Sequence, residues 1–354
     1  MILLESTFAS FKNTGIATVI NDIEKVLKKN RISYQTVSYF DFYKKKSTMD
    51  WYKYYNVDLN KKIKTLSIND TFVCPANLGG FLLYKKRKCQ SVFLIHDIFE
   101  YTSKKGIKRF IQKIRFTKIL NNVDKIITIS KFSQNEIENF FPRTNGKINV
   151  CFSASINILP EKKLTEPWIR DNKELINSGK FLLANGSGQP RKNAEFLIKY
   201  AKSLYMDFGL KLVLFGKDFY NDGYLKLKKE IQENNVESFI IHVGEVTNQE
   251  LNILYKRTAC FIFPSTYEGL GIPPLEALNQ GARCAVSDIP VFKETMKPMT
   301  CFFDFSYESL KNTITNIMKI NESEYDTLRK AVLSKFTNEI FEQNILKLFC
   351  YNER

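Results

Sequence analysis

The chain has 354 residues, of which 44% are hydrophobic and 25% charged, a composition typical of a globular protein and a length that suggests two domains. No apolar run reaches the roughly 18 residues of a membrane-spanning helix, and the seven cysteines stand singly without a C-x-x-C pair, which indicates neither a disulfide framework nor a zinc site. The first residues, "MILLESTFAS", lack the basic start and long apolar core of a signal peptide, so we expect a first strand there and a reducing cytoplasm around the protein.

The formal net charge of +16 is divided unevenly along the chain. Residues 1–150 hold 27 Lys and Arg against 12 Asp and Glu, whereas residues 151–354 hold 26 against 25. A bias confined to one half indicates that this half faces something anionic. We favour an anionic membrane surface or an anionic acceptor over nucleic acid, because no nucleic-acid-binding motif accompanies the charge.

Both halves alternate short β-branched runs with helical patterns. Predicted strands cover residues 2–4, 33–39, 71–75, 92–97, 125–130 and 147–151, and then 180–185, 211–216, 239–244, 260–265 and 283–288. Predicted helices include 14–29, 104–120 and 132–140, and then 194–206 and 249–258. This alternation predicts α/β architecture with parallel sheets covered by helices on both faces. We therefore expect two doubly wound, Rossmann-like domains that face a central cleft.

The domain boundaries follow from where the alternation lapses. Residues 153–172 lose the pattern and contain prolines, which indicates a junction. The N-terminal domain is therefore predicted to cover 1–155 and the C-terminal domain 170–335. A last helical stretch runs from about 321 to 350, and its final part, within 336–354, is expected to pack back on the N-terminal domain.

Two segments of the first half are strongly basic. Residues 84–88, "YKKRK", and 104–118, "KKGIKRFIQKIRFTK", carry eleven cations and no acidic residue. In the second segment Ile107, Phe110, Ile111 and Ile114 recur at helical spacing. A basic helix with such a face suits an anionic membrane surface. The alternative is that the apolar stripe packs on the sheet while the lysines are solvated, and for the stripe we favour this alternative.

Residues 263–281 read "FPSTYEGLGIPPLEALNQG" and place two glutamates eight positions apart. A buried strand leads into a loop that contains Glu268, and the prolines then open a helix with Glu276 expected in its first turn. Ligands of open α/β sheets bind at such strand ends. Gly269 and Gly271 are expected to leave backbone amides open to a close ligand. Each residue alone has an ordinary explanation, as a tight turn or a charge that complements the helix dipole.

The combination resembles the E-x7-E signature of the retaining glycosyltransferases of family GT4, which have the GT-B fold. Five further segments resemble parts of those enzymes in the same order: "NTGIATVINDI", "FLIHDIFEY", "VDKIITISKFSQNEI", "FLLANGSGQPRKNAEFLI" and "HVGEVTNQELNILYKRTACFIFPS". The resemblance thus covers nearly the whole chain. It implies a hexosyltransferase that uses a nucleotide-sugar donor with a GDP, UDP or dTDP group.

The resemblance also implies roles for individual residues. Glu276 would bind the ribose hydroxyls of the donor, and Glu268 would bind the donor sugar and stabilise developing positive charge. Arg191 and Lys192 would clamp the diphosphate as it leaves. The remaining implied residues are Gly186, Ser187, Gly269, Leu270 and Gly271 around the donor, Gly15 near its diphosphate, and His96 near the acceptor. Many relatives carry an arginine where this chain has Ser187, so which cation touches which phosphate stays open.

The other histidine, His242, is expected to be structural, and "RKN" has the alternative explanation of a solvated helix start. No D-x-D motif occurs, so we expect no catalytic metal, and no cofactor besides the donor substrate. The acceptor is expected to be a saccharide, and linkage of this saccharide to polyprenyl diphosphate would suit the assembly of a surface polysaccharide or O-antigen. The enzyme would then work in the cytoplasm, peripherally at the inner face of the membrane. The alternative is a non-catalytic GT-B subunit that binds a nucleotide-sugar or glycan.

Overall fold

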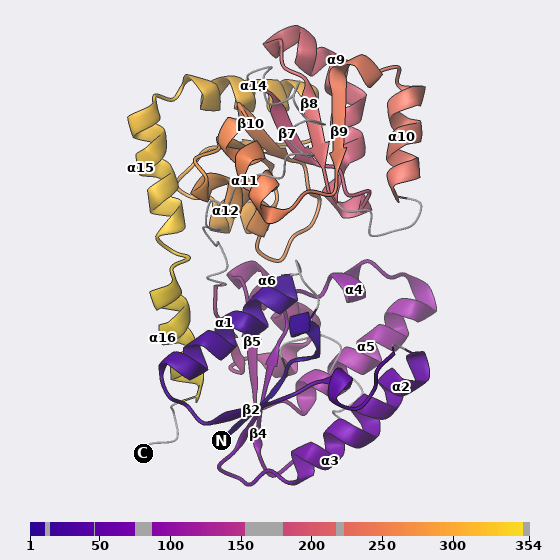
Figure 1. The fold of residues 1–354 in the computed structure, drawn as a ribbon, viewed down its shortest axis with the longest axis vertical. Coiled ribbons are helices and arrows are strands. Elements are labelled where there is room, and N and C mark those ends of the chain that lie inside the picture. The colour runs from indigo at the N-terminus through magenta and orange to yellow at the C-terminus, as the bar shows by residue number, and fades with distance from the viewer. Residues whose placement is uncertain (11–14, 46, 75–86, 153–179, 217–222, 350–354) are drawn as a thin grey trace. The chain divides into compact units, whose positions relative to one another are not determined.

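The computed structural model describes residues 1–10, 15–45, 47–74, 87–152, 180–216 and 223–349 (Figure 1). The chain divides into two compact units. The first unit comprises Met1–Ser155 and Phe336–Arg354, and the second unit comprises Ile156–Lys335. Each unit contains one six-stranded sheet in which every pair of neighbouring strands is parallel. The predicted junction, 153–172, lies outside the described residues.

The sheet of the first unit has the order β2-β1-β3-β4-β5-β6. Its strands are β1 (Ile2–Glu5), β2 (Tyr34–Val37), β3 (Thr71–Cys74), β4 (Gln90–Leu94), β5 (Lys125–Thr128) and β6 (Ile148–Val150). Its α-helices are α1 (Gly15–Lys29), α2 (Thr48–Lys53), α3 (Leu59–Lys64), α4 (Phe99–Thr102), α5 (Gly106–Asn121), α6 (Lys131–Phe140) and α16 (Asn338–Phe349). The four central strands, β1, β3, β4 and β5, are largely buried, as expected for short apolar runs covered on both faces of a parallel sheet, whereas the edge strands β2 and β6 are partly exposed.

Residues 48–64, to which the sequence patterns assign no element, form α2, a π-helical turn (Tyr54–Asp58) and α3. Aromatic packing holds this segment in place. The ring of Tyr39 stacks on Trp51, with their centroids 4.6 Å apart, and meets Tyr54 edge-on at 5.7 Å. Such contacts depend on residues far apart in the chain, so local periodicity does not predict them.

The last helical stretch is two helices, α15 (Glu322–Leu333) in the second unit and α16 in the first. Helix α16 lies against α1, as Figure 1 also shows. Glu342 accepts from the Lys29 ammonium at 2.6 Å and from the Asn30 amide at 2.8 Å. The Lys125 ammonium donates to the carbonyl of Leu348 at 3.0 Å. Helix α16 therefore packs in the first unit, although it follows the second unit in the sequence.

The sheet of the second unit has the order β12-β11-β10-β7-β8-β9. Its strands are β7 (Leu182–Asn185), β8 (Leu212–Phe215), β9 (Ile240–Gly244), β10 (Cys260–Phe263), β11 (Cys284–Ser287) and β12 (Phe302–Phe303). Its other helices are α9 (Ala194–Phe208), α10 (Gly223–Glu233), α11 (Asn248–Arg257), α12 (Ile272–Asn279), α13 (Pro290–Thr295) and α14 (Tyr307–Lys319). The two residues of β12 are too few for an alternation pattern, and the sequence patterns do not predict this strand.

The strand order of the second unit creates a switch point between β7 and β10. From β7 the chain proceeds outward through β8 and β9, and it then returns to β10 on the other side of β7 before it continues to β11 and β12. The loops that leave the carboxyl ends of β7 and β10 therefore turn in opposite directions. Open α/β sheets bind ligands at this point.

The prediction that the apolar stripe of the basic helix packs on the sheet is wrong. In α5 the side chains of Ile107, Phe110, Ile111 and Ile114 are 75%, 62%, 51% and 41% exposed. The helix instead buries three apolar residues at its other end: Phe116, Ile119 and Leu120. Of the other basic run, residues 84–86 lie outside the described ranges, and the guanidinium carbon of Arg87 lies 5.3 Å from the centre of the Phe72 ring.

Candidate active site

Two loops of the second unit bring three charged side chains together at the switch point. After β7 the chain forms a short 3-10 turn, Pro190–Lys192, and enters α9 through Asn193, whose φ of 53° is left-handed. After β10 it forms the loop that carries Glu268. Backbone contacts join the loops, because the Thr266 N–H donates to the Arg191 carbonyl at 2.8 Å.

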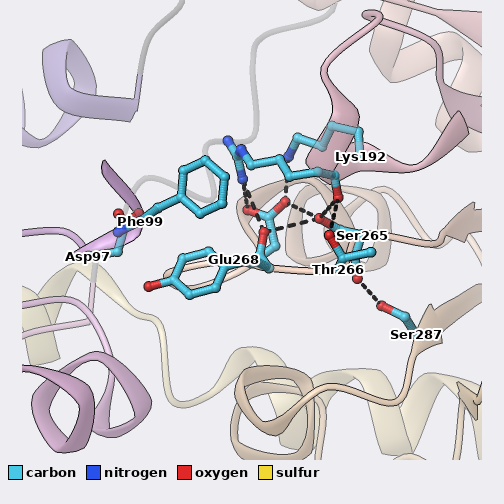
Figure 2. A network of polar contacts seen from close by, with 9 residues as sticks. Asp97, Phe99, Lys192, Ser265, Thr266, Glu268 and Ser287 are labelled. Atoms are coloured by element: carbon cyan, nitrogen blue, oxygen red, sulfur yellow. Dashed lines mark hydrogen bonds and ion pairs between the residues drawn. The ribbon is translucent and has the colours of Figure 1, made fainter. Parts of the chain in front are cut away.

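The carboxylate of Glu268 forms ion pairs with two cations. One carboxylate oxygen lies 2.6 Å from the Lys192 ammonium, and the other lies 2.9 Å from the Arg191 guanidinium. Glu268 and Lys192 are buried, whereas Arg191 is partly exposed. Figure 2 shows Lys192 directed at the glutamate. The three groups carry one net positive charge, which suits an anionic ligand.

The ionisation of this cluster follows from its burial and its charges. Burial opposes ionisation of Glu268, but the two cations outweigh it and hold the pKa of this carboxyl below its ordinary value. Burial also lowers the pKa of Lys192, against the opposing effect of Glu268. The Lys192 ammonium lies 4.5 Å from the centre of the Phe263 ring, which adds a cation–π contact. We therefore treat Glu268 as an ionised group with two counter-ions.

Ser265 and Ser287 support this arrangement, and the sequence analysis missed both. The Ser265 hydroxyl lies 2.7 Å from a carboxylate oxygen of Glu268 and donates to it. The Ser287 hydroxyl, at the end of β11, donates to the Ser265 carbonyl (Figure 2). Three neighbouring segments thus fix the orientation of Glu268. The only signal in the sequence is the place of Ser265 three residues before the glutamate.

Glu276 stands apart from the ion-paired cluster. Helix α12 starts at Ile272, so Glu276 lies beyond the first turn, and the prediction of a first-turn position is wrong because the helix begins before the prolines. The residue is half-buried, and its carboxyl makes no hydrogen bond or ion pair with the described residues. Burial raises its pKa to about 7, and Lys192 only partly opposes this. Near neutral pH this group therefore exists in both protonation states.

The glycine of the loop before α12 has a structural requirement. Gly271 has a φ of 87°, and a Cβ built on it would lie 2.4 Å from the ring of Phe292. No other residue fits there without displacement. Gly269, Leu270 and Gly271 are all buried in the described structure.

The end of β7 supplies an unpaired polar group. Gly186 donates its N–H to the Phe215 carbonyl at 2.7 Å, and a Cβ on it would lie 2.9 Å from Leu214. Ser187 follows, buried, and its hydroxyl has no partner among the described residues. Buried polar atoms without partners are uncommon and often mark ligand positions. His242 on β9 makes a hydrogen bond to the Gly186 backbone.

The remaining predicted residues belong to the first unit. His96 follows the end of β4, its Nε2 atom is buried without a partner in the described ranges, and burial lowers its pKa to about 4. It is therefore a neutral imidazole at pH 7. Gly15 is the first residue of α1, and residues 11–14 before it lie outside the described ranges. The described part of the chain has no group of three or more His, Cys, Asp or Glu side chains arranged for a metal ion.

Comparison with known proteins agrees with the resemblance seen in the sequence. Residues 167–332 match the family model of the glycosyl transferases group 1. The O-antigen chain mannosyltransferase RfbU of Salmonella typhimurium is 27% identical over 253 residues, which cover 70% of this chain and 63% of that protein. The O-antigen chain mannosyltransferase B of Escherichia coli is 27% identical over 214 residues, or 58% of this chain and 55% of that one. The matched regions thus span less than two thirds of either relative.

A solved structure shares the fold over the full length. The structure of Anabaena Alr3699/HepE in complex with UDP and glucose has a TM-score of 0.71, with 13% identity and 99% coverage of both chains. The predicted fold is confirmed by this likeness and by the two parallel six-stranded sheets. Residues 167–332 therefore resemble the group 1 glycosyl transferases, and the fold of the chain is GT-B.

Proposed function

We propose that the protein is a retaining glycosyltransferase that moves a hexose from a nucleotide-sugar to a hydroxyl of a saccharide. The observation that supports this most is the cluster of Arg191, Lys192 and Glu268 at the switch point of the family-matched unit. One net positive charge there suits a diphosphate, and the partnerless hydroxyl of Ser187 lies on the loop after β7. The names of the relatives favour mannose as the sugar and an O-antigen chain as the acceptor. We propose in addition that this acceptor is linked to lipid.

In the proposed reaction the donor diphosphate draws Arg191 and Lys192 away from Glu268. The bond between the anomeric carbon and the phosphate oxygen breaks, and the two cations neutralise the leaving group. The released carboxylate of Glu268 stabilises the oxocarbenium-like sugar. The acceptor hydroxyl attacks the same face and gives its proton to a departing phosphate oxygen, so the anomeric configuration is retained.

The charge that a divalent ion supplies in other transferases comes here from the two cations, and we propose that the reaction is independent of metal. Glu276 binds the ribose diol, and His96 contacts the sugar near the acceptor. The enzyme works in the cytoplasm at the inner face of the membrane, where a lipid-linked acceptor is presented. None of the described helices is long and apolar enough to cross a bilayer.

The test is turnover of a donor panel that contains GDP-mannose, UDP-glucose and a dTDP-hexose. Release of nucleoside diphosphate is followed with and without a lipid-linked saccharide acceptor. We expect one donor to turn over, and Glu268→Gln to abolish it. Glu195→Gln, which breaks the exposed pair with Lys226, serves as the control. Thermal stabilisation by a donor without any turnover would favour the non-catalytic subunit instead.

A further inference from the structure

Helix α5 carries two apolar faces, and the fold uses only one. At about 100° per residue, Phe116, Ile119 and Leu120 lie on one side of the helix, and Ile107, Phe110, Ile111 and Ile114 lie on the opposite side. The first set is buried in the core of the first unit, and the second set is exposed. Four large apolar side chains on one exposed stripe are more than scattered surface residues and indicate an interaction site.

The charge around the stripe is of one sign. Helix α5 contains no acidic residue. Lys108 and Lys113 are exposed and lie roughly 100–120° from the centre of the stripe, one on each side. Lys104 and Lys105 precede the helix and are exposed as well. The stripe is thus bordered by lysines, whose long side chains can extend their ammonium groups toward the same surface that the stripe contacts.

We propose that the exposed face of α5 docks the protein on a bilayer that contains anionic lipid. The apolar stripe enters the boundary between headgroups and acyl chains, and the lysines on both borders contact the lipid phosphates. A second copy of the chain fits less well, because two such faces would bring like charges together along both borders. The inference rests on exposure and charge in the first unit and goes beyond the proposed transfer reaction, which rests on the second unit.

Arg109 does not belong to the docking surface. Its guanidinium carbon lies 5.2 Å from the centre of the Tyr101 ring and 5.7 Å from that of Phe140. Its replacement would disturb the packing of α5 on the first unit, so it is excluded from the test.

The test is sedimentation of the full chain with vesicles of phosphatidylcholine alone or with an equal part of phosphatidylglycerol. We expect binding to the anionic vesicles only, weakened by salt because the Debye length falls from about 10 Å at 0.1 M to about 3 Å at 1 M. The combined variant Lys105→Glu, Lys108→Glu and Lys113→Glu is expected to lower the partition coefficient about tenfold or more. Its control carries the same charge change on exposed lysines of the second unit: Lys202→Glu, Lys228→Glu and Lys319→Glu.

A second pair of variants separates insertion from adsorption. Phe110→Ser combined with Ile111→Ser keeps every charge and is expected to weaken binding, most clearly at high salt, where the apolar contribution remains. Ile68→Ser, at a side chain 76% exposed outside α5, is the control and is expected to leave binding unchanged. The side chains are exposed, so each variant is expected to melt at the temperature of the unchanged protein.

Equal binding by the α5 variants and their controls would overturn the inference, as would no preference for anionic vesicles. The inference would also be overturned if the protein did not bind vesicles but formed dimers at higher concentration, and if Phe110→Ser combined with Ile111→Ser dissociated these dimers. The exposed face would then be assigned to a second copy of the chain. Vesicle binding by a protein that turns over no donor would leave this inference standing and reject the proposed reaction, so the two failures are distinguishable.

Discussion

Glu268→Gln tests the buried ion-paired cluster most directly. The variant leaves the buried Lys192 ammonium without its counter-ion at 2.6 Å, while Arg191 is exposed enough to be solvated. Removal of one partner of a buried pair costs about 3–5 kcal/mol. Because glutamine keeps the shape of the side chain, we expect the lower value, about 3 kcal/mol. For a unit of this size, that corresponds to a fall of about 6–12 °C in the melting temperature.

The assay is thermal unfolding of Glu268→Gln, Lys192→Met and the double variant, analysed as a double-mutant cycle. Replacement of both partners removes the uncompensated charge, so we expect the double variant to lose less than the sum of the single losses, by about 1 kcal/mol or more. Glu195→Gln, at the exposed pair with Lys226, is expected to cost under about 0.5 kcal/mol.

Nucleotide binding gives a second measurement on the same variants. In the unchanged protein a diphosphate competes with Glu268 for the two cations, whereas in Glu268→Gln it meets cations without a counter-ion. We therefore expect UDP or GDP to bind Glu268→Gln at least as tightly as the unchanged protein, and to raise its melting temperature more. The account of the buried pair would be refuted if Glu268→Gln lowered the melting temperature by less than about 2 °C. It would also be refuted if the stability losses of the two single variants simply added up in the double variant.

Further predictions concern Glu276, the proposed chemistry and His96. If ionised Glu276 accepts from the ribose diol, donor affinity should rise about tenfold from pH 6 to pH 8 because its pKa is about 7, and calorimetry with Glu276→Gln should show no such rise. Because the pKa of Glu276 is raised in the folded protein, its contribution to the free energy of unfolding is present below about pH 4.3 and is lost as the pH rises through 7. The free energy of unfolding of Glu276→Gln should therefore depend less on pH over this range. Transfer activity should persist in the presence of EDTA, and loss of activity would contradict the proposed independence of metal. The product, analysed by NMR, should keep the donor's anomeric configuration, and an inverted product would contradict the proposed mechanism. The pH profile of kcat/KM should lack an inflection near 6.5 from His96, whose pKa is about 4, and His96→Ala should lower kcat without unfolding the protein.

The fold class could be predicted from sequence, because short apolar runs alternate with helical patterns in both halves of the chain. Each of the predicted strands forms within a few residues of its expected bounds. The central strands were easiest to predict, because a strand buried on both faces is a short apolar run. The resemblance to a glycosyltransferase family was also visible in the sequence, since the motifs occur in the family's order along one chain. Gly271 illustrates the limit of such motifs: its need for glycine is readable, but its neighbour Phe292 is not.

Local sequence patterns could not predict which charged groups lie in contact, because this depends on the order of the strands in the sheet. Arg191 and Lys192 are separated from Glu268 by more than seventy residues, and their ion pairs exist because β7 and β10 are neighbours in the sheet. The supporting role of Ser265 and the pKa values of the two glutamates follow from the same packing. Helix α5 shows the converse case. Its sequence pattern predicted an apolar face. Because the helix has two apolar faces, the pattern does not predict which face is buried, since burial depends on the elements that surround the helix.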